Sequence, residues 1–237
     1  MSEWAAKRFW KQAEVVPTES GYSIQLDGRD VKTPAKTLLD VPTKTLAEAI
    51  CAEWDAQGEQ INPLTMPMTR TANSALDKVR HQHGDVADML AAYGDSDLIC
   101  YRADGPENLV ARQAEAWDPL VDFAQQKLGA TLQPRCGIMH VPQDPAALAT
   151  LSNQVHVLGA FELAAFHDLV ALSGSLVIGF GAIHQYASMD SLWALSRIDE
   201  EWQIAQWGED EDATAQMEVK QKAFIHAGDF YRLCIQN

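Results

Sequence analysis

The sequence predicts an α+β protein with a small N-terminal antiparallel-sheet domain that carries one helix, followed by a larger all-α helical domain. Short alternating runs separated by glycine and proline fill the first 42 residues and indicate strands. From Thr43 the apolar spacing lengthens to about four residues, which indicates helix. Beyond Pro67 mainly helical patterns follow, joined by short Gly- or Ser-containing connections that favour antiparallel packing. We place the two domains at residues 1–66 and 67–237.

The clearest local signal in the strand region is a hairpin. Tyr22–Leu26 alternates apolar with polar side chains, and Asp27-Gly28 follows directly. Both residues tolerate the positive φ angles of a type I′ turn. We expect Val31–Thr33 to be the return strand, with further short strands at 13–16 and 36–41 completing an antiparallel meander.

The first helix is predicted over residues 43–58. Leu46, Ile50 and Trp54 recur every four residues, so they share one face. Thr43 or Thr45 can cap its start, because a hydroxyl at that position accepts from a free backbone N–H group.

The end of this helix and the crossing after it follow from glycine and proline. Gly58 can supply the left-handed residue that closes a helix. Glu53 and Asp55 flank Trp54 and are expected to point away from the packed face. Pro63 and Pro67 predict an extended segment over 61–67.

The remaining chain reads as helices with two irregular stretches. Asp95–Arg102 suits either a helical turn or a strand, and 131–141 is irregular or a short strand. A break or kink is expected at Pro119, Gly129 is expected to end the same helix, and Asp85 is the expected cap of the third helix. Residues 1–11, with Trp4, Phe9 and Trp10, are expected to form an arm that packs on the body. The predicted helices are 69–81, 85–93, 106–128, 145–157, 159–173, 175–187, 189–207 and 212–234.

Charge and cysteine spacing exclude several classes of function. The net charge is −15, which disfavours nucleic-acid or anionic-membrane binding because both need a basic surface. No apolar run approaches the about 20 residues of a membrane span. The four cysteines form no CxxC pair, so we expect free thiols in a reducing compartment.

Motifs for catalysis, cofactors or metals are missing from the sequence. It contains no GxxxxGK[ST] phosphate loop, no GxSxG elbow and no HExxH pair. His167-Asp168 lies in an apolar helix and is expected to be a satisfied pair. We therefore predict no catalytic, cofactor-binding or metal-binding residues.

An acidic stretch is the strongest candidate for recognition. Residues 190–218 contain nine acids and one base, Arg197, which gives a local charge of −8. The helical period places an inward stripe at Leu195, Ile198, Trp202 and Ala205, and it places Asp199, Glu200, Gln203 and Trp207 outside it. A large aromatic side chain beside carboxylates suits a protein-recognition patch. The alternative is a solvated face, with the acids at 209–212 favouring the dipole of the last helix.

Several motifs give the chain a family resemblance. They are RFWKQ at Arg8–Gln12, LDGRDVKTP at Leu26–Pro34, AEWDAQGEQINPLTMPMTRTANSALD at Ala52–Asp77, SDLICYR at Ser96–Arg102 and SRIDEEWQIAQWGEDED at Ser196–Asp212. In this order the sequence resembles the ATP synthase assembly chaperones that act on the alpha subunit of the catalytic head. The match runs over nearly the whole length, and only the last helix, from Ala213, matches loosely.

The resemblance implies a fold, a function and site residues. It implies an N-terminal α+β domain, a C-terminal helical domain and a non-enzymatic chaperone that keeps the alpha subunit soluble until the beta subunit replaces it. The family's essential acid falls at Glu200, with Asp199 and Glu201 as alternatives. Trp54 stands in the family's EWD motif and is also expected to matter, either for packing or for binding the partner. Without the targeting extension of mitochondrial-matrix relatives, the chain is expected to be a bacterial, cytoplasmic member. We expect a monomer.

Two other classes of function stay open at this stage. One is a small-molecule enzyme that uses an inter-domain cleft with His167, Asp168 and Glu162. The other is an acidic adaptor for a basic protein, whose binding would depend steeply on salt.

Overall fold

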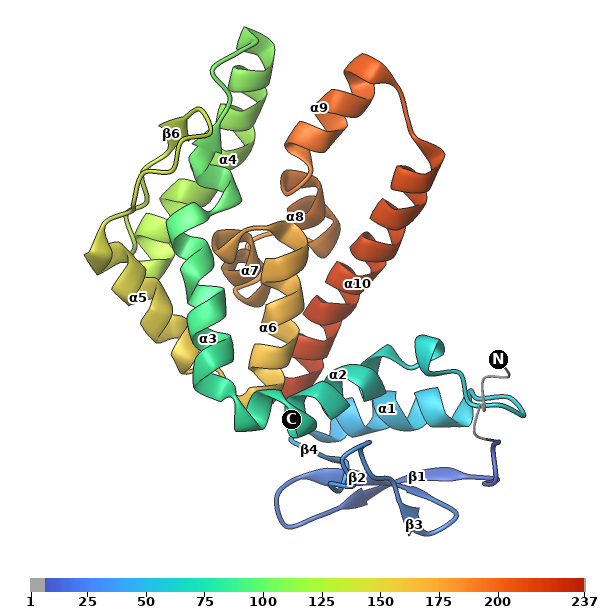
Figure 1. Cartoon of the computed structure of the whole chain (residues 1–237). Coiled ribbons are helices and arrows are strands. Elements are labelled where there is room, and N and C mark those ends of the chain that lie inside the picture. Colours follow the sequence, from blue (N-terminus) through green and yellow to red (C-terminus); the bar gives the residue numbers. More distant parts are fainter. Residues whose placement is uncertain (1–6, 237) are drawn as a thin grey trace. The chain divides into compact units, whose positions relative to one another are not determined.

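The computed structural model describes residues 7–236 and confirms the α+β class (Figure 1). Trp4, assigned above to an N-terminal arm, lies outside the described residues. Grouped by contacts, the chain forms two compact units. Of the described residues, the first unit holds 7–83, 159–165 and 229–236, and the second holds 84–158 and 166–228. The predicted domain boundary between residues 66 and 67 falls inside the first unit, and it stays a prediction.

The first unit is built on a four-stranded antiparallel sheet. The hairpin turn forms as expected, because Asp27 and Gly28 both have positive φ, at 47° and 77°. Strand β2 pairs with β1 from Ala13↔Leu26 to Pro17↔Tyr22, and it also pairs with β3 and β4. The strands are β1 Ala13–Pro17, β2 Tyr22–Leu26, β3 Arg29–Asp30 and β4 Asp40–Val41.

The predicted return strand at Val31–Thr33 is wrong. A two-residue turn places Arg29 directly opposite Leu26, so the return strand is Arg29–Asp30. Val31 still donates to the Ile24 carbonyl at 2.9 Å, but the chain then leaves the ladder.

Helix α1, Lys44–Asp55, has the predicted cap and the predicted apolar face. Thr43 Oγ1 accepts from Leu46 N at 3.2 Å. Leu46 and Ile50 are fully buried, whereas Trp54 is half-buried and meets Trp10 edge to face, with ring centroids 5.3 Å apart. The side chains of α1 thus close the core over the sheet.

The core of the first unit joins distant parts of the chain. Sheet and α1 side chains pack with Ala165 and with Phe230 and Cys234 near the C-terminus. Thr45 Oγ1 donates to the Leu233 carbonyl at 3.2 Å, so the start of α1 and the end of the last helix are also joined by a hydrogen bond.

The predicted role of Gly58 is wrong, because Ala56 is the C-cap of α1, in the right-handed conformation. The helix stops at Asp55, and the glycines with positive φ do not include Gly58. The buried Gln57 side chain donates to the Glu53 carbonyl at 2.9 Å and accepts from Asn62 N at 2.8 Å. The Gln57 amide thus links the end of α1 to Asn62, and α1 ends without a residue in the left-handed conformation.

The carboxylates beside Trp54 are engaged, which corrects the expectation that they point away. Glu53 accepts from Met68 N at 2.6 Å, from Thr69 N at 2.8 Å and from Thr69 Oγ1 at 2.7 Å. It therefore caps helix α2, Pro67–Asp77. Burial raises the pKa of Glu53, and the hydrogen bonds from Thr69 and Met68 oppose that rise. Asp55 accepts from Ala13 N at 3.1 Å and so holds β1.

The crossing before α2 is not fully extended as predicted. Pro63–Thr65 forms one 3₁₀ turn, with Pro63 at its first position and the Asn62 side chain accepting from Leu64 N. A first-turn position suits proline, because its missing N–H would have no partner there. A second 3₁₀ turn, Val79–His81, follows α2.

The second unit is helical apart from one short parallel pair, β5 Tyr101–Arg102 with β6 Arg135–Cys136. Helices α6 and α10 each have one end in the first unit. The helices are α3 His83–Ala91, α4 Glu107–Leu128, α5 Pro145–His156, α6 Ala160–Ser173, α7 Leu176–Ile183, α8 Met189–Leu195, α9 Ile198–Trp207 and α10 Glu211–Ile235, with 3₁₀ turns at Ala92–Ser96 and Leu98–Cys100. None of the helices within residues 7–236 combines the length and apolar character needed to cross a membrane.

Several predicted helix boundaries change in the structure. The helix predicted over 189–207 is two helices, because the chain turns at Ser196-Arg197 between α8 and α9. Helix α4 continues past Pro119, and Gly129 ends it in the left-handed conformation as predicted, with φ 71°. Asp85 lies inside the first turn of α3 instead of at its cap.

The second unit has its own apolar core and one buried carboxylate. Gly179 on α7 lets α6 approach, since a Cβ there would lie 2.7 Å from Val170 Cγ2. Asp97 is fully buried and accepts from Ile99 N and Val177 N, at the start of α7. Burial raises the pKa of Asp97 to about 6, although its hydrogen bonds oppose the rise.

Candidate functional site

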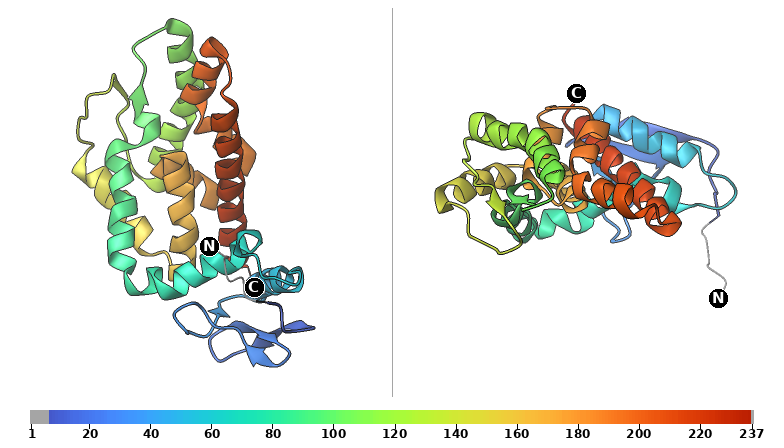
Figure 2. Two further views of the ribbon diagram at one scale, coloured as in Figure 1. Left: turned by 45° about the vertical axis from the view of Figure 1, so that its right-hand side comes forward. Right: turned by 90° about the horizontal axis from the view of Figure 1, so that it is seen from above.

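Three consecutive acids open helix α9 and form what we call the acidic row: Asp199, Glu200 and Glu201. Helices α4 and α9 contact each other in the second unit near the start of α9, and the left view of Figure 2 shows the two helices close together. Each carboxylate of the row has a different partner, so the three acids are not equivalent.

Asp199 is held by an amide from α4. The Gln113 side chain is 2% exposed, and its Nε2 donates to Asp199 Oδ1 at 2.6 Å. Its Oε1 accepts from Ala103 N at 2.7 Å, which fixes the orientation of the amide. Asp199 is therefore positioned by a neutral group that does not cancel its charge.

Glu200 and Glu201 each pair with an arginine. Glu201 pairs with Arg112 on α4, and Glu200 Oε1 lies 2.7 Å from Arg197 Nη1. Arg197 itself is anchored, because its guanidinium stacks over the Trp193 ring at 4.8 Å. With both glutamates about half exposed, these pairs orient the side chains more than they stabilise the fold.

The far end of α9 presents an exposed aromatic ring. Trp207 is 79% exposed and precedes Gly208, whose φ of 89° ends the helix. The predicted inward stripe is wrong at Ala205, which is exposed, whereas Ile198 is buried and Trp202 is half-buried. The stripe stops early because α9 packs on α4 only near its beginning, where Arg112 and Gln113 reach it.

Trp54 belongs to the first unit and has a different environment. Its ring packs on Trp10, and its indole N–H has no hydrogen-bond partner within residues 7–236. Trp10 is also covered by the Arg8 guanidinium at 5.2 Å. These contacts give Trp54 a place in the core of the first unit.

The histidine pair named above is a local ion pair. His167 Nδ1 lies 2.9 Å from Asp168 Oδ1, and that hydrogen bond raises the pKa of His167. Glu162 accepts from Gly159 N and so caps the start of α6. Within residues 7–236, no group of three or more His, Cys, Asp or Glu side chains is arranged to hold a metal ion.

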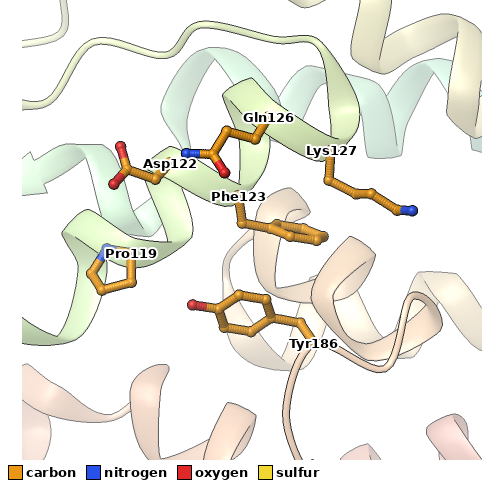
Figure 3. A pocket seen from close by; sticks show the side chains of 6 residues that line it. All are labelled: Pro119, Asp122, Phe123, Gln126, Lys127 and Tyr186. Carbon is orange, nitrogen blue, oxygen red and sulfur yellow. The ribbon is translucent and has the colours of Figure 1, made fainter.

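A shallow hollow of about 440 Å³ lies elsewhere on the second unit (Figure 3). The rings of Phe123 and Tyr186 face each other there with centroids 4.9 Å apart. Burial and the nearby Lys127 charge lower the pKa of His184, whose ring lies 6.2 Å from Phe123. None of the predicted site residues lines this hollow. Its lining is Pro119, Asp122, Phe123, Gln126, Lys127 and Tyr186.

The partners of the acidic row are the part that sequence reasoning missed. Arg112 and Gln113 stand 89 and 86 residues from the acids they contact. The only local signal was a glutamine on an otherwise apolar stripe of α4. Two side chains of α4 therefore hold the acidic row in place in the free protein.

Comparison with known proteins places the chain in a family. A sequence model described as "ATP12 chaperone protein" matches residues 7–125. The mitochondrial protein atp12 of Schizosaccharomyces pombe is 27% identical over 219 residues, covering 87% of this chain and 75% of that protein.

Solved structures agree over nearly the full length. Atp12 from Paracoccus denitrificans has a TM-score of 0.95 at 46% identity, covering 98% of this chain and all of that one. A putative chaperone from Agrobacterium tumefaciens has a TM-score of 0.91 at 36% identity, covering 97% and 86%. The chain therefore belongs to the ATP12 chaperone protein family, and it is an ATP synthase assembly chaperone.

Proposed function

We propose that the client is the unassembled alpha subunit of the F-type ATP synthase catalytic head. The chaperone covers the interface of that subunit until the beta subunit replaces it. The observation that carries this proposal is the acidic row, held by α4 and followed on the same helix by the exposed Trp207. Carboxylates that are already held in place, followed by an exposed aromatic ring, suit protein recognition, because the held acids lose little side-chain entropy on binding.

This function needs no chemistry at the site. A subunit interface that is normally buried in an assembly aggregates when it is exposed alone. A temporary partner that binds this interface less tightly than the beta subunit does is displaced by the beta subunit with a decrease in free energy, so no nucleotide hydrolysis is needed. The sequence contains no phosphate loop, which is consistent with such a passive, non-enzymatic chaperone.

The five proposed site residues take different roles. Asp199, Glu200, Glu201 and Trp207 contact the client directly. For Trp54 we propose a packing role within the first unit, since its ring packs against the buried Trp10. Among the acids, Asp199 has an amide partner and its charge is left uncancelled, whereas each glutamate already faces an arginine.

We further propose that the protein acts as a monomer in the bacterial cytoplasm. The likeness to Atp12 from the bacterium Paracoccus denitrificans supports the bacterial setting. Analytical ultracentrifugation of the free chain checks the oligomeric state: a concentration-dependent dimer would contradict the monomer.

Binding to separated subunits tests the proposal. The purified chain is titrated with isolated alpha subunit and, in parallel, with isolated beta subunit. We expect saturable binding to alpha alone and loss of that binding in Glu200→Lys. Glu115→Lys, at an exposed acid on α4, is the control for charge. Equal binding to beta, or no binding to alpha, would refute the proposed client.

A further inference from the structure

Residues 199–223 form a helical hairpin without a core. It consists of most of α9, the connection Gly208–Asp210 and the first half of α10 (Figure 1). None of these residues is buried, although Ile198 just before them and Phe224 just after them are. Helix α5, of similar length to one arm, buries three side chains. The stretch therefore lacks the packing that stabilises the other helices.

The hairpin is fixed at its base and capped at its tip. At the base, Asp199 and Glu201 are held from α4, as described above. At the tip, Asp210 Oδ1 accepts from Ala213 N at 2.9 Å and starts α10. Capping favours the helical conformation, but isolated helices of this length are marginal in water. The hairpin is thus positioned by its base and has a low local stability beyond it.

The hairpin carries apolar side chains that no part of the described chain covers fully. Trp207 and Val219 are 79% and 67% exposed, and Trp202, Ile204 and Met217 are only half-buried. Buried apolar surface contributes about 25 cal/mol per Å², so these side chains offer binding energy that folding has not used.

Charge identifies the kind of surface that fits there. Residues 199–223 contain eight acids and two lysines, Lys220 and Lys222, a net charge of −6. An apolar strip bordered by acids is complementary to an apolar patch bordered by arginine and lysine. The acids then steer the encounter, and the apolar residues supply the affinity. Tryptophan can also take a cation on its ring face.

We infer that the α9–α10 hairpin is the docking element for a basic-rimmed apolar segment of the client, and that it acquires its core only in the complex. This inference rests on the proposed function for the identity of the client. Beyond that function, the first half of α10 belongs to the contact surface, and the hairpin becomes ordered when it binds the client.

Hydrogen–deuterium exchange of the full chain, alone and with excess isolated alpha subunit, tests the coupling. In the free chain, amides of residues 202–223 should exchange at least tenfold faster than those of α5. In the complex, exchange over 202–223 should slow at least tenfold, whereas exchange in α5 should stay unchanged.

Paired variants test the apolar contact. Trp207→Ala should weaken binding to the alpha subunit at least tenfold, with an unchanged circular dichroism spectrum. Ile138→Ala, which removes a 93% exposed side chain in a loop of the same unit, should bind like the wild type. If the subunit binds but exchange over 202–223 does not change, the inference fails while the proposed client stands. Normal binding of Trp207→Ala also overturns the inference, and it removes Trp207 from the proposed contact residues without changing the proposed client. No binding at all overturns both.

Discussion

Gln113 on α4 donates to Asp199 on α9 at 2.6 Å, and the same amide accepts from Ala103 N at 2.7 Å. This buried side chain thus joins the segment after β5 to the first turn of α9. It decides how the acidic row is presented, although nothing near Asp199 in the sequence points to it.

Replacing this amide should be costly. Gln113→Leu keeps much of the volume but leaves Ala103 N and the inner oxygen of Asp199 without partners. A buried polar group left unpaired costs about 1–3 kcal/mol, so the free energy of unfolding should fall by at least that amount. Urea denaturation measures it. Gln126→Leu on the same helix is the control, because Gln126 lines the open hollow, and a loss as large there would contradict the account.

Glu53 and Glu48 offer a matched pair on α1. Glu53 accepts three hydrogen bonds at the start of α2, whereas Glu48 makes only an exposed i,i+4 pair with Lys44. Glu53→Ala should lower the free energy of unfolding by about 1–3 kcal/mol. Glu48→Ala should lower it by about 0.5 kcal/mol or less. Equal effects in urea denaturation would show that the α2 cap contributes little.

Two glycines should respond with opposite signs to alanine. Gly179→Ala places a methyl group 2.7 Å from Val170 Cγ2 and should destabilise the fold by about 1–3 kcal/mol. At Gly84, in the first turn of α3, an added methyl group would point into open space, so Gly84→Ala should stabilise by up to about 1 kcal/mol. Thermal unfolding of both variants checks the signs, and a stabilising Gly179→Ala would refute the close α6–α7 packing.

Asp97 predicts a specific pH dependence of stability. Its pKa is about 6 in the folded protein against an ordinary value of 3.8, so the folded state binds the proton more tightly. The resulting stabilisation is complete below about pH 4 and is lost as the pH rises through about 6. Its slope approaches about 1.4 kcal/mol per pH unit within that window.

The comparison with Asp97→Asn isolates this contribution. The amide cannot accept from both Ile99 N and Val177 N, so the variant should be less stable at pH 7. The stability difference from wild type should then widen as the pH falls from 7 to 4, since only the wild type gains. A difference that stays constant over this range would contradict the raised pKa.

Sequence predicted the features that local chemistry decides. The Asp27-Gly28 turn, the Thr43 cap and the Gly129 helix end formed as expected, because each depends on a few adjacent residues. The predicted end of α1 was wrong because the helix stops at Asp55 with Ala56 as its C-cap, and the Gln57 side chain then holds the following loop by accepting from Asn62 N. The helix break at Ser196-Arg197 was missed because an uninterrupted helical period continues across it.

In the candidate site, too, sequence predicted only what depends on neighbouring residues. The acids at the start of α9 could be found from their density, but their partners on α4 come from a helix that only the tertiary fold brings close. Which acid keeps an uncancelled charge depends on those partners. Composition therefore predicted an acidic recognition surface. Only the fold shows that Asp199, Glu200 and Glu201 have different partners.

The acidic row and Trp207 are proposed to shield the alpha subunit from aggregation. Light scattering of isolated alpha subunit, diluted from denaturant with increasing amounts of chaperone, measures it directly. Wild type and Glu115→Lys should suppress scattering near equimolar ratio, whereas Glu200→Lys and Trp207→Ala should need at least tenfold more protein at unchanged thermal stability. Full suppression of scattering by both site variants, or no suppression by the wild type, would contradict this shielding role.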